Sequence, residues 1–279
     1  MGIPFSKMSG SGNTFLVIDN RKQVVESALK EFDLSLDTLI IRACSPVFGV
    51  GADGMILIED SSEYNFAWRF YNADGSHANM CGNGARCAAR YARMIGLTGD
   101  ESDFETGAGV VHSKVNGEDV LVTLTPPSAI TPDIDLELAG THYTSYFIDT
   151  GVPHLVIPVK SISEVDVDRL GSEARHDPRF APEGTNVNFT SLTKRGTLRV
   201  RTFERGVEGE TMACGTGVTA AALVYAYLGR VTSPVTVVPI SGESLTVHFT
   251  REGDAFRAVI IEGPTRVVVS GELHPDALR

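Results

Sequence analysis

Two cysteines, Cys81 and Cys214, open two segments of the chain that read almost as copies of each other. Residues 81–96 run CGNGARCAARYARMIG, and residues 214–229 run CGTGVTAAALVYAYLG. In both, Cys-Gly-x-Gly leads into an alanine-rich stretch that ends on a glycine, which predicts a tight turn, a helix and a glycine cap. Each cysteine is therefore expected at a helix N-terminus, where unpaired N–H groups and the helix dipole stabilise a thiolate and can bind a carboxylate.

A matched pair of thiols predicts proton transfer at a carbon atom. Inverting a centre next to a carboxylate requires a base on one face, an acid on the opposite face and stabilisation of the carbanion. Two cysteines at two helix N-termini supply all three. A single cysteine is more often a small packing residue, and we interpret Cys44 and Cys87 in that way because neither has a duplicated counterpart. The matched flanks of Cys81 and Cys214 favour catalysis.

The sequence offers little support for a cofactor or a metal. Residues 49–54 spell GxGxxG but lead into a strand pattern, and residues 215–220 lack the βαβ context and the later acidic residue of a dinucleotide site. None of the six lysines has the context of a Schiff-base residue. His77, Cys81 and Cys87 lack the spacing of a metal site. We therefore expect catalysis without a cofactor and without a metal.

The internal repeat extends beyond the two cysteine segments. Gly51 and Gly184 each lie 30 residues before the cysteine of their half, and the apolar runs 15–18 and 154–157 correspond. The two cysteines are separated by 133 residues, about half the chain, which indicates gene duplication rather than a short structural repeat.

Short β-branched runs separated by turns outnumber the helical patterns. Besides the two helices after the cysteines, helices are predicted around residues 35–44 and 165–171. Many strands and few helices in two similar halves predict an α+β fold of two pseudo-symmetric lobes, with the active site in the cleft between them. The Pro-rich stretch 125–132 suggests a lobe boundary after residue 127.

Composition limits the partners. The formal charge of −11 over 279 residues argues against a nucleic-acid or anionic-membrane partner. No apolar run approaches the roughly 20 residues of a membrane-spanning helix. Four cysteines in a chain of this size do not form a disulfide framework, so we expect a reducing cytoplasm.

Several longer strings resemble the diaminopimelate epimerase family, in order and through nearly the whole chain. They are SGSGN (9–13), FGVGADG (48–54), NADGSHANMCGNGARC (72–87), TGVPH (150–154) and ERGVEGETMACGTG (204–217). The resemblance implies a cofactor-independent isomerase that interconverts LL- and meso-diaminopimelate, on the route to lysine and peptidoglycan. It also implies a homodimer, in which each lobe is a curled, mostly antiparallel, barrel-like sheet around a central helix. The last strand, 267–279, would return to the N-terminal lobe, so that the C-terminal lobe covers 128–266.

The resemblance assigns roles to particular residues of this chain. Cys81 and Cys214 match the two acid/base cysteines, while His154 and Glu204 match residues that tune the thiol pKa values. Arg205 would offer a bidentate fork to the distal carboxylate of a substrate with two amino-acid ends. The positions that match substrate-binding residues are Asn13, Asn72, Gly82, Asn83, Asn186, Glu204, Arg205, Gly215 and Thr216.

Two positions depart from the family pattern, because many relatives carry glutamine where this chain has Gly54 and asparagine where it has Val152. Two alternatives therefore stay open at the level of sequence. One is a cofactor-free racemase of another amino acid. The other is a non-catalytic protein that holds a carboxylate at the two helix ends.

Overall fold

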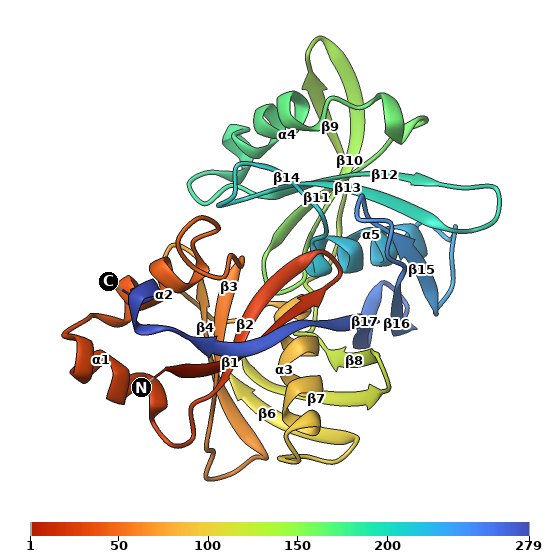
Figure 1. The fold of residues 1–279 in the computed structure, drawn as a ribbon. Coiled ribbons are helices and arrows are strands. Elements are labelled where there is room, and N and C mark those ends of the chain that lie inside the picture. The colour runs from red at the N-terminus through yellow and green to blue at the C-terminus, as the bar shows by residue number, and fades with distance from the viewer. Residues whose placement is uncertain (1, 279) are drawn as a thin grey trace. The chain divides into compact units, whose positions relative to one another are not determined.

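The computed structural model describes residues 2–278 and divides into two compact units. Unit 1 comprises Met1–Val122 and Pro264–Arg279, and unit 2 comprises Thr123–Gly263. Each unit has a curled β-sheet and one long helix that packs against it, α3 (Gly82–Met94) in unit 1 and α5 (Gly215–Tyr227) in unit 2 (Figure 1).

The strand β1 (Ile3–Gly10) of unit 1 pairs antiparallel with both β2 (Asn13–Asp19) and the last part of β17 (Ala255–Leu273). β2 runs parallel to β3, β3 pairs antiparallel with β4, and β4 pairs antiparallel with β5 and parallel with β6. β6, β7 and β8 complete an antiparallel meander. The elements are β1 (Ile3–Gly10), β2 (Asn13–Asp19), α1 (Val24–Phe32), α2 (Leu36–Cys44), β3 (Gly54–Glu59), β4 (Phe66–Asn72), β5 (His77–Ala78), α3 (Gly82–Met94), β6 (Glu101–Thr106), β7 (Gly109–Asn116), β8 (Asp119–Thr123) and η3 (Pro275–Leu278).

Unit 2 repeats this order of pairings. β9, β10 and β11 are antiparallel, β11 runs parallel to β12, and β13 pairs antiparallel with β12 and β14 and parallel with β15. β15, β16 and the first part of β17 close the series. The elements are β9 (Thr131–Leu138), β10 (Thr141–Asp149), β11 (Pro153–Pro158), η1 (Ile162–Glu164), α4 (Val167–Arg175), η2 (Pro178–Phe180), β12 (Asn186–Leu192), β13 (Leu198–Glu204), β14 (Gly209–Thr211), α5 (Gly215–Tyr227), β15 (Val235–Val238), β16 (Leu245–Glu252) and β17 (Ala255–Leu273).

The shared order of pairings confirms the predicted duplication and the α+β class. The correspondence holds residue by residue at the parallel pairs, where Phe15 lies opposite Gly54 in unit 1 and His154 lies opposite Asn186 in unit 2. Each unit thus has a central hairpin, β3–β4 in unit 1 and β12–β13 in unit 2. Each strand of that hairpin also pairs in parallel with one further strand.

Both central helices begin where the sequence predicts. Cys81 and Cys214 are the N-cap residues of α3 and α5, each with extended backbone dihedrals. Beyond the helix ends, Gly96 (φ 72°) and Gly229 (φ 67°) adopt the left-handed conformation that favours glycine. Alanines and glycines on both helices are almost entirely buried, because small side chains let a helix approach the enclosing sheet closely.

The outer face of each sheet is covered by other helices. In unit 1, α1 and α2 pack on a cluster that includes Leu16, Ile18 and Leu57. In unit 2, α4 covers a cluster that includes Leu155 and Ile157. The predicted helices at 35–44 and 165–171 are confirmed as α2 and α4, whereas α1 was not predicted. Its N-cap residue, Gln23, has a left-handed conformation and makes no side-chain cap, so the usual start signal is missing. Within residues 2–278, no helix combines the length and apolar character needed to cross a membrane.

Candidate active site

In unit 1, the Cys81 thiol lies at the N-terminus of α3. Its Sγ accepts a hydrogen bond from the backbone N–H of Gly84, at 3.4 Å, and the residue is half-buried. A Cβ on Gly84 would lie 3.3 Å from Ile56 Cδ1 and 3.5 Å from Cys81 Cβ, so the glycine keeps this turn close to the sheet. Backbone N–H donation and the positive end of the helix dipole both favour negative charge at this sulfur.

A buried network joins two of the predicted substrate-binding asparagines beside Cys81. Asn83 donates from Nδ2 to Asn13 Oδ1 at 2.6 Å, and Asn83 Oδ1 accepts from Arg86 Nη2 at 3.0 Å. The same Arg86 nitrogen donates to Ser11 Oγ at 2.9 Å. The structure therefore brings Asn13, Gly82 and Asn83 together with Cys81. Asn72, at the end of β4, donates instead to Ser76 Oγ at 3.0 Å.

Arg86 is a residue that sequence reasoning missed. Its side chain is the largest among the fully buried ones, although it lies on a helix where arginine is ordinarily solvated. The available signal is its place among the small residues Gly84, Ala85, Ala88 and Ala89, on a helix segment that the sequence predicts to be buried. Arg86 fixes the amide of Asn83, and through it the amide of Asn13.

In unit 2, the Cys214 thiol has the matching place at the start of α5. Its Sγ lies 3.5 Å from Thr216 Oγ1, and the residue is 8% exposed. Thr150 donates to the carbonyl of Thr216 at 3.2 Å, and Thr219 donates to the carbonyl of Gly215 at 2.9 Å. These side chains hold the first turn of the helix, while its N–H groups remain directed at its N-terminal end.

The strand ends around Cys214 carry the remaining predicted residues. Asn186 Oδ1 accepts from the backbone N–H of Arg205 at 2.9 Å, and Asn186 Nδ2 donates to the carbonyl of Pro153 at 2.9 Å. Glu204 Oε2 accepts from Thr211 Oγ1 at 2.9 Å. Within residues 2–278, the guanidinium of Arg205 makes a long contact of 3.5 Å to the carbonyl of Glu183. Asn186 therefore sets the backbone from which Arg205 projects.

His154 is fully buried on β11, a strand that contacts α5. Burial and, to a lesser extent, the nearby charge of Arg205 together lower the pKa of its imidazole to about 3. His154 is therefore neutral at physiological pH. Any effect that it has on a neighbouring thiol comes from a neutral ring and not from an imidazolium.

This neutrality predicts a loss of stability in mild acid. The unfolded chain protonates His154 as the pH falls below 6.5, whereas the native chain stays unprotonated until about pH 3. The contribution is fully present above pH 6.5, and about 2 kcal/mol of it is lost at pH 5. Urea unfolding at pH 7.5 and pH 5 measures this difference. His154→Phe should abolish that part of the pH dependence; an unchanged pH dependence in the variant would contradict a neutral buried histidine.

The other two cysteines, Cys44 and Cys87, do not have the properties of acid/base residues. Both are buried, and burial raises the pKa of each thiol to about 12. Each is therefore protonated at neutral pH and unsuited to act as a base.

The two departures from the family pattern, Gly54 and Val152, are the duplicated counterparts of Asn186 and Asn13. A Cβ on Gly54 would lie 2.5 Å from the carbonyl oxygen of Tyr71 and 2.8 Å from the ring of Phe70. No side chain fits at Gly54 unless the neighbouring strand β4 moves. Of these paired positions, unit 1 therefore has an asparagine at Asn13 and unit 2 has one at Asn186.

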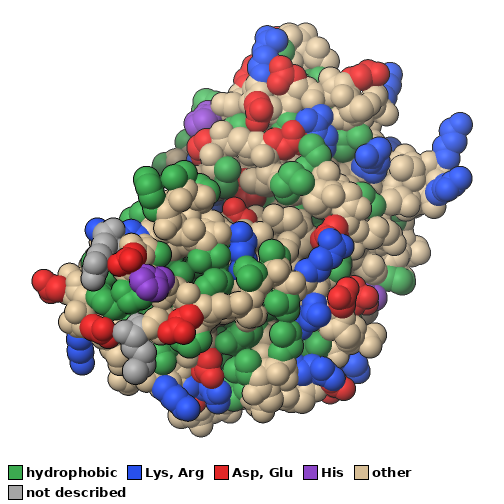
Figure 2. Space-filling model, in the orientation of Figure 1, with side chains coloured by type: hydrophobic (Ala, Val, Ile, Leu, Met, Phe, Trp, Pro, Cys, Tyr) green, Lys and Arg blue, Asp and Glu red, His purple; other side chains and the backbone are tan. Residues whose placement is uncertain are grey.

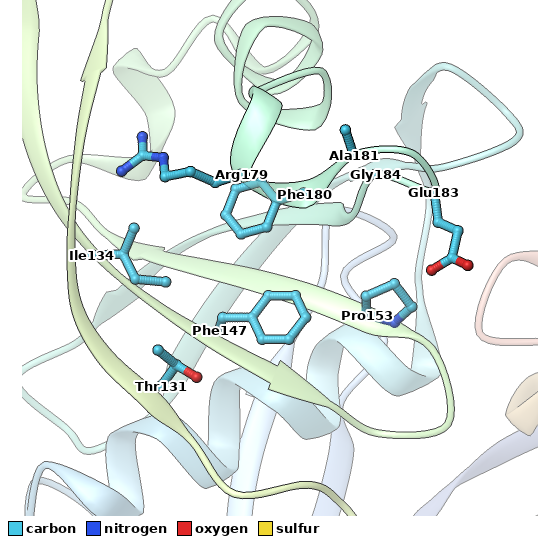
Figure 3. Close-up of a pocket in the computed structure, with 9 residues that line it drawn as sticks. All are labelled: Thr131, Ile134, Phe147, Pro153, Arg179, Phe180, Ala181, Glu183 and Gly184. Carbon is cyan, nitrogen blue, oxygen red and sulfur yellow. The ribbon is translucent and has the colours of Figure 1, made fainter.

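A cavity of about 370 Å³ in unit 2 lies outside this set of residues (Figure 3). Phe147 and Phe180 stack in its wall with ring centroids 5.6 Å apart, and both pack against the cluster beneath α4. Arg179 at its rim is paired with Asp177. None of the predicted site residues lines this cavity. Within residues 2–278, no group of three or more His, Cys, Asp or Glu side chains is arranged to hold a metal ion.

The family model described as diaminopimelate epimerase matches residues 5–130 and 146–268. The chain is 46% identical over 279 residues to the diaminopimelate epimerase of Aquifex aeolicus (strain VF5), covering 98% of this chain and 99% of the relative. It is 42% identical over 275 residues to that of Hydrogenobaculum sp. (strain Y04AAS1), covering 96% of this chain and 97% of the relative.

Solved structures of the same fold are more distant in sequence. A Bacillus anthracis phenazine biosynthesis protein of the PhzF family superposes with a TM-score of 0.73 at 15% identity, covering 98% of this chain and 99% of its own. A probable proline racemase from Agrobacterium radiobacter K84 superposes with a TM-score of 0.71 at 16% identity, covering 98% and 93%. At such identities the likeness is one of fold.

Proposed function

Because the chain belongs to the diaminopimelate epimerase family, we propose that it is the isomerase that converts LL-diaminopimelate into meso-diaminopimelate without a cofactor. The product is a precursor of lysine and of peptidoglycan. The observation that carries the proposal is the duplicated pair of cysteines, each the N-cap of a central helix.

The proposed chemistry is a proton transfer through two thiols. One cysteine, as thiolate, takes the α-hydrogen as a proton; the C–H bond breaks and its electron pair is delocalised into the adjacent carboxylate. The other cysteine then gives its S–H proton to the opposite face of the carbon, which inverts the centre. In the reverse direction Cys81 and Cys214 exchange roles. Backbone N–H groups at Gly82, Asn83, Gly215 and Thr216 would stabilise the charge on that carboxylate.

Recognition of the substrate would come from the asparagines and from Arg205. The distal end of diaminopimelate carries a second carboxylate, which a planar guanidinium binds through two parallel hydrogen bonds. Arg205 suits this role because its backbone is fixed by Asn186, while its guanidinium makes a long hydrogen bond of 3.5 Å in the part of the chain that the structure describes. Asn13, Asn72 and Asn83 would supply further amides, and Glu204 with His154 would adjust the thiol pKa values.

Exchange of the α-hydrogen tests the proposal. The protein is incubated in deuterium oxide with diaminopimelate and, separately, with other amino acids, and deuterium incorporation is followed by NMR together with the ratio of stereoisomers. Exchange and inversion on diaminopimelate are the expected result. Exchange confined to another amino acid would indicate a racemase of different specificity, and no exchange on any of them would leave a carboxylate-binding protein.

We further propose that the protein is a homodimer joined through the free edge of β17. One edge of its last part pairs with β1, and on the other edge the backbone N–H of Thr265 donates to the carbonyl of Glu118, the residue before β8. Val267, Val268 and Val269 are 36%, 55% and 46% exposed. Over the path of β17, hydrophobic side chains lie among charged ones on the molecular surface (Figure 2). Such an edge strand tends to pair with another chain.

The charges on this edge are self-complementary. Antiparallel pairing of β17 with its copy about a two-fold axis at Val269 would place Arg266 opposite the partner's Glu272, twice per dimer. Arg266→Glu or Glu272→Arg alone should each weaken the dimer, and the double variant should restore it, as measured by sedimentation equilibrium. If the double variant stays as weak as the single ones, or if all three remain dimers, this edge is not the interface.

The proposed chemistry also suits a cytoplasmic location. Both thiols must stay reduced to carry protons, and a reducing compartment maintains them in that form.

A further inference from the structure

Three buried polar side chains of unit 2 form a hydrogen-bonded set beneath the first turn of α5. Asn188 lies between His154 and Thr202, and the three residues are 0%, 0% and 3% exposed in that order. Asn188 Nδ2 lies 3.1 Å from His154 Nδ1 and donates to the carbonyl of Leu155 at 3.1 Å. Asn188 Oδ1 accepts from Thr202 Oγ1 at 2.9 Å.

These contacts determine which ring nitrogen of His154 carries the hydrogen. The carbonyl of Leu155 can only accept, so the amide nitrogen of Asn188, and not its oxygen, must face it. The second hydrogen of that nitrogen then points at His154 Nδ1, which must accept it through its lone pair. A neutral imidazole whose Nδ1 accepts has its hydrogen on Nε2.

The duplicated half shows that the fold does not require this polar set. By the strand pairings, the positions of His154, Asn188 and Thr202 correspond in unit 1 to those of three apolar residues, which are Phe15, Ile56 and Phe70. Phe15 and Phe70 pack edge to face with centroids 5.8 Å apart. Burying polar groups lowers the stability of a fold unless they are hydrogen-bonded. Unit 1 forms the corresponding sheet with apolar side chains at these three positions. The polar pair His154 and Asn188 at these positions therefore points to chemistry.

The set also lies against the turn that carries Cys214. A Cβ on Gly217, in the first turn of α5, would lie 2.3 Å from Asn188 Oδ1 and 3.3 Å from Cys214 Cβ. Within residues 2–278, His154 Nε2 has no hydrogen-bond partner, although the ring is fully buried. A buried N–H without a partner is costly unless a ligand or a charged form of the site accepts from it.

We propose that Asn188 is a positioning residue that holds His154 in the tautomer with hydrogen on Nε2, so that this N–H donates to negative charge formed at the start of α5. Because the ring is neutral, it acts as a hydrogen-bond donor and not as a proton carrier. The proposal deepens the two-thiol mechanism and rests on it only for the catalytic consequence.

Nitrogen NMR of the unmodified protein tests the tautomer directly. In protein labelled with ¹⁵N-histidine, ring ¹⁵N–¹H correlations distinguish Nε2–H, Nδ1–H and imidazolium forms. The resonances that disappear in His154→Phe identify His154 among the seven histidines. The expected form is Nε2–H, unchanged from pH 8 to pH 6. An Nδ1–H form, or a charged ring at pH 6, would overturn the proposal.

Substitutions at Asn188 test the cause. The carboxylate of Asn188→Asp cannot donate, so it should accept from Nδ1 and move the hydrogen there. Asn188→Ile, which copies the residue of unit 1, should leave the tautomer unfixed. In either variant kcat should fall by about 100-fold, the effect of losing one positioned donor, with a smaller change in KM. An unchanged tautomer or an unchanged kcat in a folded variant would contradict the assignment.

Thr202→Val is the matched control. It removes the hydrogen bond to Asn188 Oδ1 but leaves Asn188 Nδ2 in place. Its melting temperature should fall, while the tautomer of His154 and kcat stay near those of the wild type. If Thr202→Val lowered kcat as much as Asn188→Asp, the set would have only a structural role. Because the NMR result does not depend on turnover, an inactive protein with the expected tautomer would contradict the proposed function and not this inference.

Discussion

Cys81→Ala and Cys214→Ala should each lower the rate of diaminopimelate epimerisation by about 10⁴-fold or more, because each variant lacks one obligatory partner in proton transfer. The loss should appear in kcat, with substrate binding largely retained. Circular dichroism should show a native fold, since each cysteine is only the cap of its helix and alanine leaves the helix itself intact.

Exchange of the α-hydrogen without inversion of the stereocentre tests the two-thiol mechanism more directly than the loss of rate. Each single variant retains one thiol, which can still remove a proton and return deuterium to the same face. Each variant should therefore exchange the α-hydrogen of one stereoisomer only, and the two variants should act on opposite ones. Cys87→Ala, on the same helix as Cys81, should epimerise normally apart from lower stability. Normal turnover in either catalytic variant, or exchange of both stereoisomers by one of them, would rule out the two-thiol mechanism.

Arg205→Met should raise KM for diaminopimelate by about 100-fold, since charge-assisted hydrogen bonds to a carboxylate contribute about 1.5–3 kcal/mol each. Arg205→Lys should recover only part of this loss, because an ammonium retains the charge but not the planar fork. Steady-state kinetics on diaminopimelate measure both.

Arg199→Met is the control on the same strand. Arg199 is exposed on β13, so its replacement should leave KM unchanged. If Arg205→Met left KM near that of the wild type, the distal carboxylate would have to be bound elsewhere. The backbone N–H of Arg205 survives every one of these changes, so the hydrogen bond to Asn186 is retained throughout.

The features that local sequence determines were predictable. Glycines after Cys81 and Cys214 determine where the central helices begin, and Gly96 and Gly229 determine where they end. The backbone conformation at a helix end depends on residues close in sequence, so a local pattern predicts it. The duplication was predictable for a related reason. Two segments with the same pattern of residues are expected to fold into the same arrangement of strands and helix.

The features that depend on register between distant strands were not predictable. His154 meets Asn188 because β11 and β12 run parallel, with the whole of α4 inserted between them. Asn188 belongs to the alternating set Asn186, Asn188 and Thr190, but alternation does not show whether that face meets solvent or a helix. Arg86 was missed for the opposite reason, because a helical arginine ordinarily extends to solvent. The contact between His154 and Asn188 and the burial of Arg86 both depend on tertiary structure, which the local sequence pattern does not reveal.

The path of β17 affects how the protein folds while it is being translated. Its first part completes unit 2 beside β16, and its last part pairs with β1, where Ile3 lies opposite Leu273. One edge of β1 pairs with the neighbouring β2, but the other edge stays unpaired during translation until the residues up to Leu273 have been synthesised. Contacts of such long range slow folding, and the nascent N-terminal half meanwhile has an unpaired strand edge that chaperones would need to shield.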